Sequence, residues 1–370
     1  MVQVAIIGGG LAGIVNAIQL ASKGIEVALI EQKSYPFHKV CGEYISNETL
    51  PFLAGLGFDP ADHGAANITH LEVTAPSGNS IHTKLDLGGF GLSRYVFDHT
   101  LVEIAKTHGA KILEKVKVGD IQFEGDHFTL NLTNGSVLKA EIVIGAFGKR
   151  ANIDRILDRE FFKRESPYVG VKYHMELDLP NDTISLHNFE NGYCGIVKIE
   201  GNRYCVCYLV KRKMLRAAGS VEQMEEDVLY KNKYIKRALT SGKHLYEKPE
   251  VINEISFATK SPVEDHILMA GDAAGMITPL CGNGMAMAIH SAKILSGLVI
   301  HYFKENHNRQ KLEYIYRQQW NRHFASRLRT GRIIQNLFGS NYLSEAAVST
   351  LKPFPFITDR LIRATHGKPF

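Results

Sequence analysis

The feature that most constrains the fold of this chain is a glycine-rich turn close to its first residue. Residues 2–7 (VQVAII) are an apolar, β-branched run of the kind found in buried parallel strands. Gly8 ends this run, and residues 11–23 have the apolar spacing of a helix that stops at Gly24. Residues 26–31 (EVALIE) form a second apolar run. The order of strand, helix and strand predicts a parallel βαβ unit and, with it, an α/β fold.

The turn has the spacing Gly-x-Gly-x-x-Gly, and each glycine has a physical reason to be there. Gly8 makes the tight turn, Gly10 lets the backbone approach a pyrophosphate, and Gly13 lets the helix pack closely on the strand. The helix begins at Leu11 and Ala12, so its free amides and partial positive charge would face the phosphates. These residues predict a dinucleotide site.

An acidic residue ends the second strand of the unit. Glu31 stands 23 residues after Gly8 and is followed by Gln32. A carboxylate at this position can accept hydrogen bonds from ribose hydroxyls, and it disfavours a 2′-phosphate. NADP is therefore not expected here, whereas NAD and FAD both remain open at this point.

A second glycine-rich segment favours FAD. Residues 271–285 (GDAAGMITPLCGNGM) follow the apolar run 267–270, which places Asp272 at a strand end where it could accept from a polyol chain. The segment then begins a long helix, whose first amides could stabilise negative charge on a reduced flavin ring. The alternative is a second glycine-rich turn with a capping aspartate. The contacts expected from this segment come from Gly271, Asp272, Pro279, Gly282, Asn283, Gly284 and Met285.

With these motifs, the chain resembles the FAD-containing fold of p-hydroxybenzoate hydroxylase and its relatives over residues 2–300. Residues 39–43 (KVCGE) are similar to the K-x-C-G-E segment of geranylgeranyl reductases and flavin-dependent halogenases. The resemblance implies a Rossmann-like (GR2-type) FAD-binding domain. It also implies that Lys39 and Arg94 neighbour the FAD phosphates or ribityl chain, and that the Val118 backbone meets the adenine.

The chain departs from the family in three places. Residues 146–148 (AFG) carry Phe147 where the hydroxylases have the aspartate of an Asp-Gly pair; Gly148, the glycine of that pair, is kept as a cofactor contact. Halogenases carry a WxWxIP motif, but the only tryptophan here is Trp320, which argues against halogenation. Residues 192–198 (GYCGIVK) lack the aromatic-x-Trp-x-Phe-Pro pattern of isoprenoid reductases, which weakens a geranylgeranyl substrate.

The order of the remaining segments predicts that a second domain is inserted into the first. Residues 68–75 and 80–86 predict a hairpin, residues 168–210 predict an antiparallel sheet, and residues 221–239 are predicted to be helical. We expect an FAD-binding domain of residues 1–67, 95–165 and 260–305, a substrate-binding antiparallel-sheet domain of 68–94 and 166–259, and a C-terminal helical region of 306–370.

Cys41 and Glu43 are candidates for the chemical step, and Tyr193 is a candidate for the substrate pocket. Cys41 is either a proton donor or a small buried residue, and Glu43 is either an acid–base group or a carboxylate that fixes the loop. Tyr193 begins a strand of the expected substrate sheet and either lines the pocket or packs in the core. The histidines and cysteines show none of the usual ligand spacings, so no metal is expected.

Charge and hydropathy limit the partners. The net charge is +5, and much of the excess lies in the arginines of residues 317–332. Basic runs interleaved with aromatic residues are missing, so nucleic acid is not expected, while weak contact with an anionic membrane surface stays open. The sequence has no uncharged apolar run of 18 residues and no signal peptide ahead of the first strand. A cytoplasmic protein without a transmembrane segment is expected.

Together these observations predict an FAD-dependent oxidoreductase with a small hydrophobic or aromatic substrate. Hydroxylation is common in this fold and gives a slight preference for a monooxygenase, whereas the K-x-C-G-E segment favours a carbon–carbon double-bond reductase. A second Gly-x-Gly-x-x-Gly unit is missing, so electrons would come from transiently docked NAD(P)H or from a partner reductase. The rivals are a non-catalytic binding module and an NAD dehydrogenase. The presence of all three glycines of the turn, with Glu31 and Asp272, argues against a non-catalytic binding module. Segment 271–285 argues against an NAD dehydrogenase.

Overall fold

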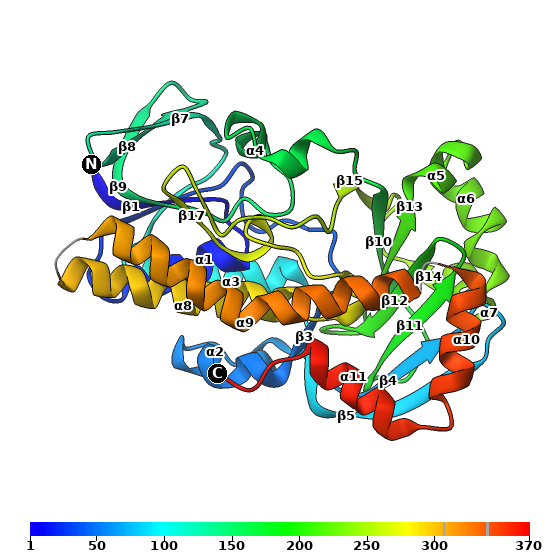
Figure 1. The fold of residues 1–370 in the computed structure, drawn as a ribbon. Helices are drawn as coiled ribbons and strands as arrows, with labels where there is room; N and C mark the ends of the chain where they lie inside the picture. The colour runs from blue at the N-terminus through cyan, green and yellow to red at the C-terminus, as the bar shows by residue number, and fades with distance from the viewer. Residues whose placement is uncertain (306–307, 338–339) are drawn as a thin grey trace.

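The computed structural model describes residues 1–305, 308–337 and 340–370, and it shows the expected α/β fold, built on two sheets (Figure 1). The expected boundary at residue 306 lies outside the described residues. The first sheet has the order β16-β17-β9-β1-β2-β6, with β7 and β8 attached to β9. Its strands are β1 (Val2–Ile7), β2 (Val27–Ile30), β6 (Lys111–Leu113), β7 (Val118–Glu124), β8 (His127–Leu132), β9 (Val137–Gly145), β16 (Val263–Glu264) and β17 (Ile267–Met269).

Three strands from distant parts of the chain end together in this sheet. β1 pairs in parallel with β9, and β9 pairs in parallel with β17. Ile7 is opposite Gly145, and Gly145 is opposite Met269. The glycine turn after β1, the segment after β9 and the segment after β17 therefore begin at one edge, which is where ligands bind in open α/β sheets.

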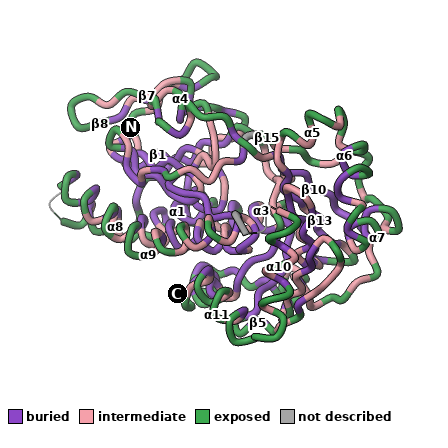
Figure 2. The backbone as a smooth tube through the Cα atoms, turned by 45° about the vertical axis from the view of Figure 1, so that its right-hand side comes forward, coloured by how far each residue is buried: buried purple, intermediate pink, exposed green. Residues whose placement is uncertain are grey.

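Helices cover the first sheet and bury its apolar strands (Figure 2). α1 (Leu11–Ala21) packs on α3 (Arg94–Thr107) and on α8 (Gly284–Lys304), and α8 packs on α9 (Arg309–Leu337). α8 is long and apolar enough to cross a membrane, but 56% of its apolar window is buried inside the protein. A buried core helix passes the same test of length and composition, and its packing identifies α8 as one.

The second sheet has the order β14-β10-β13-β12-β11-β4-β5-β3, with β15 paired to β10. Its pairs are antiparallel except β11 with β4, and the expected hairpin of residues 68–86 is β4 and β5. β3 belongs to this sheet although its residues fall in the expected segment 1–67. Its strands are β3 (Tyr44–Ser46), β4 (Ala66–Thr74), β5 (Ser80–Gly91), β10 (Tyr168–Glu176), β11 (Thr183–Phe189), β12 (Gly192–Lys198), β13 (Tyr204–Lys211), β14 (Lys243–His244) and β15 (Glu250–Ile255).

Residues 221–239 are helical, as the sequence predicts, but the helical stretch is interrupted. The structure has α6 (Val221–Asp227), a short 3₁₀ turn and α7 (Lys233–Ser241), with α5 (Arg212–Ala218) before them. The break lies at Asn232, whose side chain caps α7 through the Tyr234 amide and donates to the Asn188 carbonyl over 3.0 Å. Met224 and Ile235 pack on the outer face of β10 and β13. The break lets both helices follow the twisted sheet.

Short helices complete the chain. α2 (Leu50–Gly55) follows β3, α4 (Asn152–Ile156) follows β9, and α10 (Asn341–Leu351) and α11 (Pro355–Thr365) lie beside β5 (Figure 1). The last residues return to the first part of the chain, because the Phe370 amide donates to the Glu48 carbonyl over 3.1 Å.

Candidate functional site

A cavity of about 780 Å³ lies between the two sheets, at the carboxyl ends of β1, β9 and β17. It brings together most of the residues that the sequence selected. Gly13 and Asn283 do not line it. Gly13 packs against the turn, and the side-chain Nδ2 of Asn283 donates to the Thr365 carbonyl over 2.8 Å. The predicted residues that line the cavity are Gly8, Gly10, Leu11, Ala12, Glu31, Gln32, Lys39, Cys41, Glu43, Arg94, Val118, Gly148, Tyr193, Gly271, Asp272, Pro279, Gly282, Gly284 and Met285.

The glycine turn is shaped as its spacing requires. Gly8 has φ +104°, a conformation that residues with a Cβ rarely adopt. A Cβ on Gly13 would lie 2.0 Å from the Gly8 carbonyl oxygen, so only glycine allows α1 to start this close to β1. The first amides of α1 have no partner within the helix, and Leu11 and Ala12 line the cavity. This end of the cavity is suited to a pyrophosphate.

Glu31 holds the turn as well as lining the cavity. Its Oε2 accepts from the Gly9 amide over 2.8 Å, and its Oε1 accepts from the Lys33 amide over 3.0 Å. The Tyr35 hydroxyl donates to the Gly9 carbonyl over 2.6 Å. The acid that the sequence selected for ribose contact thus also fixes the backbone of the loop beside the phosphates.

Lys39 and Arg94 flank the turn, and Asp98 orders both. Lys39 Nζ donates to the Gly9 carbonyl over 3.0 Å and to Asp98 over 2.9 Å. Arg94 donates to both oxygens of Asp98, over 2.6 and 2.7 Å. Burial opposes ionisation of Asp98, but Arg94 and Lys39 hold its pKa below the usual value. Asp98 thus holds two cationic side chains in place beside the glycine turn, where they can bind a phosphate.

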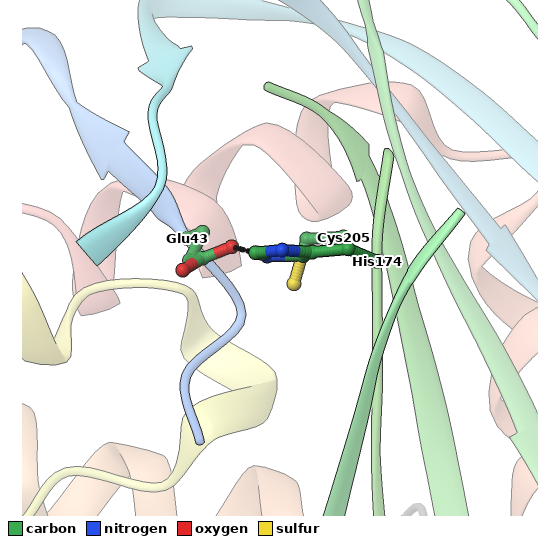
Figure 3. Close-up of side chains that lie close together, drawn as sticks. All are labelled: Glu43, His174 and Cys205. Atoms are coloured by element: carbon green, nitrogen blue, oxygen red, sulfur yellow. Dashed lines mark hydrogen bonds and ion pairs between the residues drawn. The ribbon is translucent and has the colours of Figure 1, made fainter. Parts of the chain in front are cut away.

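Glu43 is fully buried at the centre of a second ionic network, and Figure 3 shows its contact with His174. Its Oε1 accepts from Lys172 Nζ over 2.6 Å and from the Arg94 amide over 2.8 Å, and its Oε2 accepts from His174 Nε2 over 2.6 Å. Burial opposes ionisation, but Lys172 and His174 together lower the pKa of Glu43 to about 2. Glu43 is therefore a carboxylate at neutral pH.

The same glutamate forms with His174 and Cys205 a cluster in which the potential ligand atoms lie within 4.8 Å (Figure 3). Lys172 already supplies the positive charge that balances Glu43, and the Cys205 thiol donates to the Cys41 carbonyl over 3.2 Å. Burial raises the pKa of Cys205 well above its usual value, so the thiolate that a metal requires is disfavoured. We read the cluster as part of the buried ionic network of Glu43, with Cys205 packed beside it.

The segment after β17 is fixed by two buried cations. Lys260 Nζ donates to the carbonyls of Lys149 and Asp272, over 2.6 and 2.8 Å, and burial lowers its pKa to about 8. Arg159 donates to the Ala273 carbonyl over 2.9 Å and to Asp154 over 2.9 Å. These contacts hold the Gly-Asp segment against the loop that follows β9.

Reasoning from the sequence did not select four residues of the site: Asp98, Lys172, His174 and Lys260. Asp98 stands four residues after Arg94, which the sequence did select, so one turn of the same helix was a usable signal. Lys172 and His174 lie on β10, which reads as an ordinary strand. Nothing local to that strand distinguishes them from exposed polar residues.

The far end of the cavity is apolar. Tyr193 lies on β12, and burial raises the pKa of its hydroxyl well above the usual value, so the phenol stays protonated. Cys41 lies between the two ends, and its thiol donates to Met285 Sδ over 3.6 Å. The side chains that line this end include Ile184, Leu186, Ile196, Leu209, Ile252, Ile255 and Met276.

The described residues fit FAD. A phosphate would meet the α1 amides with Arg94 and Lys39, a ribose would meet Glu31, and the polyol chain would meet Asp272. The apolar end leaves room for a flat ring system and a hydrophobic substrate. A fold and a site of this kind define an FAD-binding oxidoreductase.

The family comparison agrees. A model of the FAD binding domain family matches residues 1–323, and the chain belongs to that family. It is 25% identical over 342 residues to conditioned medium factor receptor 1 of Dictyostelium discoideum, covering 82% of this chain and 64% of that protein. It is 25% identical over 389 residues to digeranylgeranylglycerophospholipid reductase 2 of Methanopyrus kandleri, covering 99% of this chain and 93% of the relative.

Solved structures share the fold. The flavin-dependent brominase Bmp2 superposes with a TM-score of 0.80 at 17% identity, over 98% of this chain and 93% of that one. PqsL of Pseudomonas aeruginosa, described as "a probable FAD-dependent monooxygenase", superposes with a TM-score of 0.76 at 16% identity, over 94% and 99%. The fold, the family and the FAD-dependent oxidoreductase class expected from the sequence are confirmed.

Proposed function

We propose that this chain reduces a carbon–carbon double bond in a hydrophobic substrate, with FAD as its redox group. The observation that carries the proposal is the position of Cys41, whose segment lines the cavity between the glycine turn and the apolar end. Bound FAD would supply hydride to one carbon of the double bond. The second carbon needs a proton, and the Cys41 thiol is the acidic group of the K-x-C-G-E segment that is placed to give it.

The buried carboxylate of that segment has a different task in this proposal. Lys172 and His174 hold the pKa of Glu43 at about 2 despite its burial, so it has no proton to donate at neutral pH. Its hydrogen bonds to Lys172 and the Arg94 amide fix the backbone that carries Cys41. Glu43 is thus a positioning residue, and Cys41 is the candidate acid.

The substrate class follows from the cavity wall. β11, β12 and β13 contribute aliphatic side chains and Tyr193 to the apolar end, which suits a hydrocarbon chain better than a charged aromatic acid. Relatives of nearly the same length are named as digeranylgeranylglycerophospholipid reductases. Because the aromatic-x-Trp-x-Phe-Pro pattern is missing, the identity of the substrate's hydrocarbon chain stays open. The electron donor is docked NAD(P)H or a partner reductase.

A monooxygenase is the second candidate, and the likeness to PqsL favours it. That structure covers almost the same length, and it has been solved in complex with 2-aminobenzoylacetate. Tyr193 gives the apolar end one hydroxyl that could orient an aromatic ring. This reaction would need oxygen and would leave Cys41 without a catalytic task.

One experiment separates the two. The FAD-loaded enzyme is reduced chemically without oxygen and mixed with digeranylgeranylglycerophospholipid or with 2-aminobenzoylacetate. Return of the oxidised flavin absorption with the lipid, together with a mass gain of two hydrogens per double bond, supports the reductase. Reoxidation that needs oxygen and yields oxygenated 2-aminobenzoylacetate contradicts it. Purified protein that takes up no FAD would overturn both.

A further inference from the structure

The last two helices of the chain carry apolar side chains on their outer surface. Fourteen large hydrophobic side chains are exposed in the described part of the chain, and six of them lie between residues 342 and 361. Tyr342 is 81% exposed and Phe356 is 68% exposed. Isolated exposed apolar residues are ordinary, but a patch of them marks an interaction surface. The six are Tyr342, Leu343, Phe354, Phe356, Ile357 and Leu361.

α11 is amphipathic in the reverse of the usual sense. A helix that covers a core normally turns its apolar stripe inward and its polar face to solvent. In α11, Thr358 and Thr365 are buried, whereas Phe356, Ile357 and Leu361 are exposed. Burial of the hydrophobic surface therefore cannot explain the outward face of this helix.

Polar contacts hold α11 in this orientation. The hydroxyl of Thr83 on β5 donates to Asp359 of α11 over 3.1 Å, and Arg363 Nε of α11 donates to Asp86 on β5 over 2.7 Å. These two contacts hold the helix against β5. Ile362 packs inward on a cluster that includes Ile184, which also lines the cavity. The apolar face is thus fixed at the surface beside a wall of the cavity, where Figures 1 and 2 show α10 and α11 next to β5.

The surroundings of this face are basic. Residues 314–344 contain five arginines and no acidic residue. α9, which carries those arginines, packs on both α10 and α11. The last segment, residues 345–370, adds Lys352, Arg360, Arg363 and Lys368 against Glu345 and Asp359. Asp86 and Glu48 pair with Arg363 and Arg327, which leaves nine basic residues against these four acids.

Aromatic and aliphatic side chains beside arginine and lysine match the boundary of an anionic bilayer, where the former enter the acyl region and the latter meet the headgroups. Two copies of this face would instead bring like charges together. We propose that the outer face of α10 and α11 docks the protein on the surface of an anionic lipid bilayer. The proposal is independent of the reaction at the flavin, and it places a cavity wall beside a source of hydrophobic substrate.

The test is co-sedimentation of the full-length, FAD-loaded protein with vesicles. One preparation contains phosphatidylglycerol and phosphatidylcholine, and the other contains phosphatidylcholine alone. We expect binding to the anionic vesicles that weakens as salt is raised, because headgroup contacts are screened. The double variant Phe356→Ser with Leu361→Ser should bind at least about tenfold more weakly, since two inserted side chains are lost.

A matched control removes exposed apolar residues elsewhere. Val137 is 59% exposed and Tyr314 is 61% exposed, so Val137→Ser with Tyr314→Ser should bind vesicles as the parent does. Equal unfolding midpoints and equal FAD absorption of all three proteins show that the folds and the flavin site are intact, which separates this result from a failure of the proposed reaction.

Three outcomes would overturn the proposal. The first is no binding to anionic vesicles. The second is unchanged binding of the Phe356 and Leu361 variant, or an equal loss in the control. The third is self-association in sedimentation velocity that the same variant abolishes while vesicles remain unbound, which would assign the face to a second copy of the chain.

Discussion

Lys172 Nζ donates to Glu43 Oε1 over 2.6 Å, across a separation of 129 residues and with both side chains buried. Lys172 also donates to the Lys39 carbonyl over 3.1 Å. Lys39 in turn donates to the Gly9 carbonyl, so a chain of buried contacts connects β10 of the second sheet to the glycine turn of the first. The position of the substrate sheet and the shape of the cofactor turn are therefore coupled.

Replacement of Glu43 by Gln should destabilise the protein strongly. The amide cannot balance Lys172, which would stay buried as an unpaired cation, and breaking such a pair costs about 3–5 kcal/mol. The measurement is the free energy of unfolding in urea. The control is Glu103→Gln, which removes a surface partner of Lys106 and should change stability by no more than about 1 kcal/mol. Equal effects of the two substitutions would refute the buried network.

Acid should remove the contribution of Glu43. Its pKa is about 2 in the folded protein against 4.5 for the free group, a lowering that Lys172 and His174 achieve against burial. Because the folded pKa is the lower one, the stability is fully present above the unfolded pKa and is lost as the pH falls through the folded one. The stability difference between the parent and Glu43→Gln should shrink by about 3 kcal/mol between pH 4.5 and 2. A difference that stays constant over this range in urea titrations would contradict the assignment.

Replacement of Gly13 by Ala should weaken FAD binding by about ten- to a hundredfold. The new methyl group would lie 2.0 Å from the Gly8 carbonyl oxygen, so α1 and the turn must move apart, at a cost of about 1–3 kcal/mol. Flavin absorption after gel filtration measures the loss. Gly297→Ala in α8 is the control, because among the described residues no heavy atom outside its own helix lies within 4 Å of the new Cβ, and alanine favours a helix by up to about 1 kcal/mol. Retention of FAD by the Gly13 variant would show that close packing is not required.

Replacement of Cys41 by Ser should slow reduction of the lipid double bond by about 100-fold, the usual contribution of a general acid. FAD content should stay the same, because the backbone of this segment is held by Glu43 and Lys172. Cys281→Ser is the matched control, since Cys281 is hydrogen-bonded to Thr278 at 3.3 Å and a hydroxyl can keep that contact. An unchanged rate in the Cys41 variant, measured by product mass, would remove Cys41 from the chemistry.

A larger side chain at Gly195 should close the apolar end of the cavity. A Cβ there would lie 3.7 Å from both the Cys207 carbonyl oxygen and Leu186 Cδ2, so alanine fits and leucine enters the cavity. We expect Gly195→Leu to raise KM for the lipid by about tenfold or more, with FAD affinity unchanged, and Gly195→Ala to leave both near the parent values. A rise in the dissociation constant of FAD instead would place the flavin, and not the substrate, at this end.

The cofactor and the fold class could be predicted from short stretches of sequence. The turn at residues 8–13 needs glycine for reasons of backbone geometry, and these act over a few neighbouring residues. The same holds for the α/β order of the first sheet, since buried parallel strands are apolar along their whole length. The break within the helical residues 221–239 could not be predicted, because it depends on Asn232, whose partners in β4 and β11 lie far away in sequence.

The sequence by itself therefore determined that the cofactor is FAD and which loops line the cavity, because the sterics of a turn and the free amides of a helix start depend on contiguous residues. The tertiary structure decided the state of Glu43, which the sequence left open between an acid–base group and a loop-fixing carboxylate. Its pKa depends on which strand arrives beside it, and β10 brings Lys172 and His174. A buried charge is set by its partners in space, and those partners exist only once the two sheets have met.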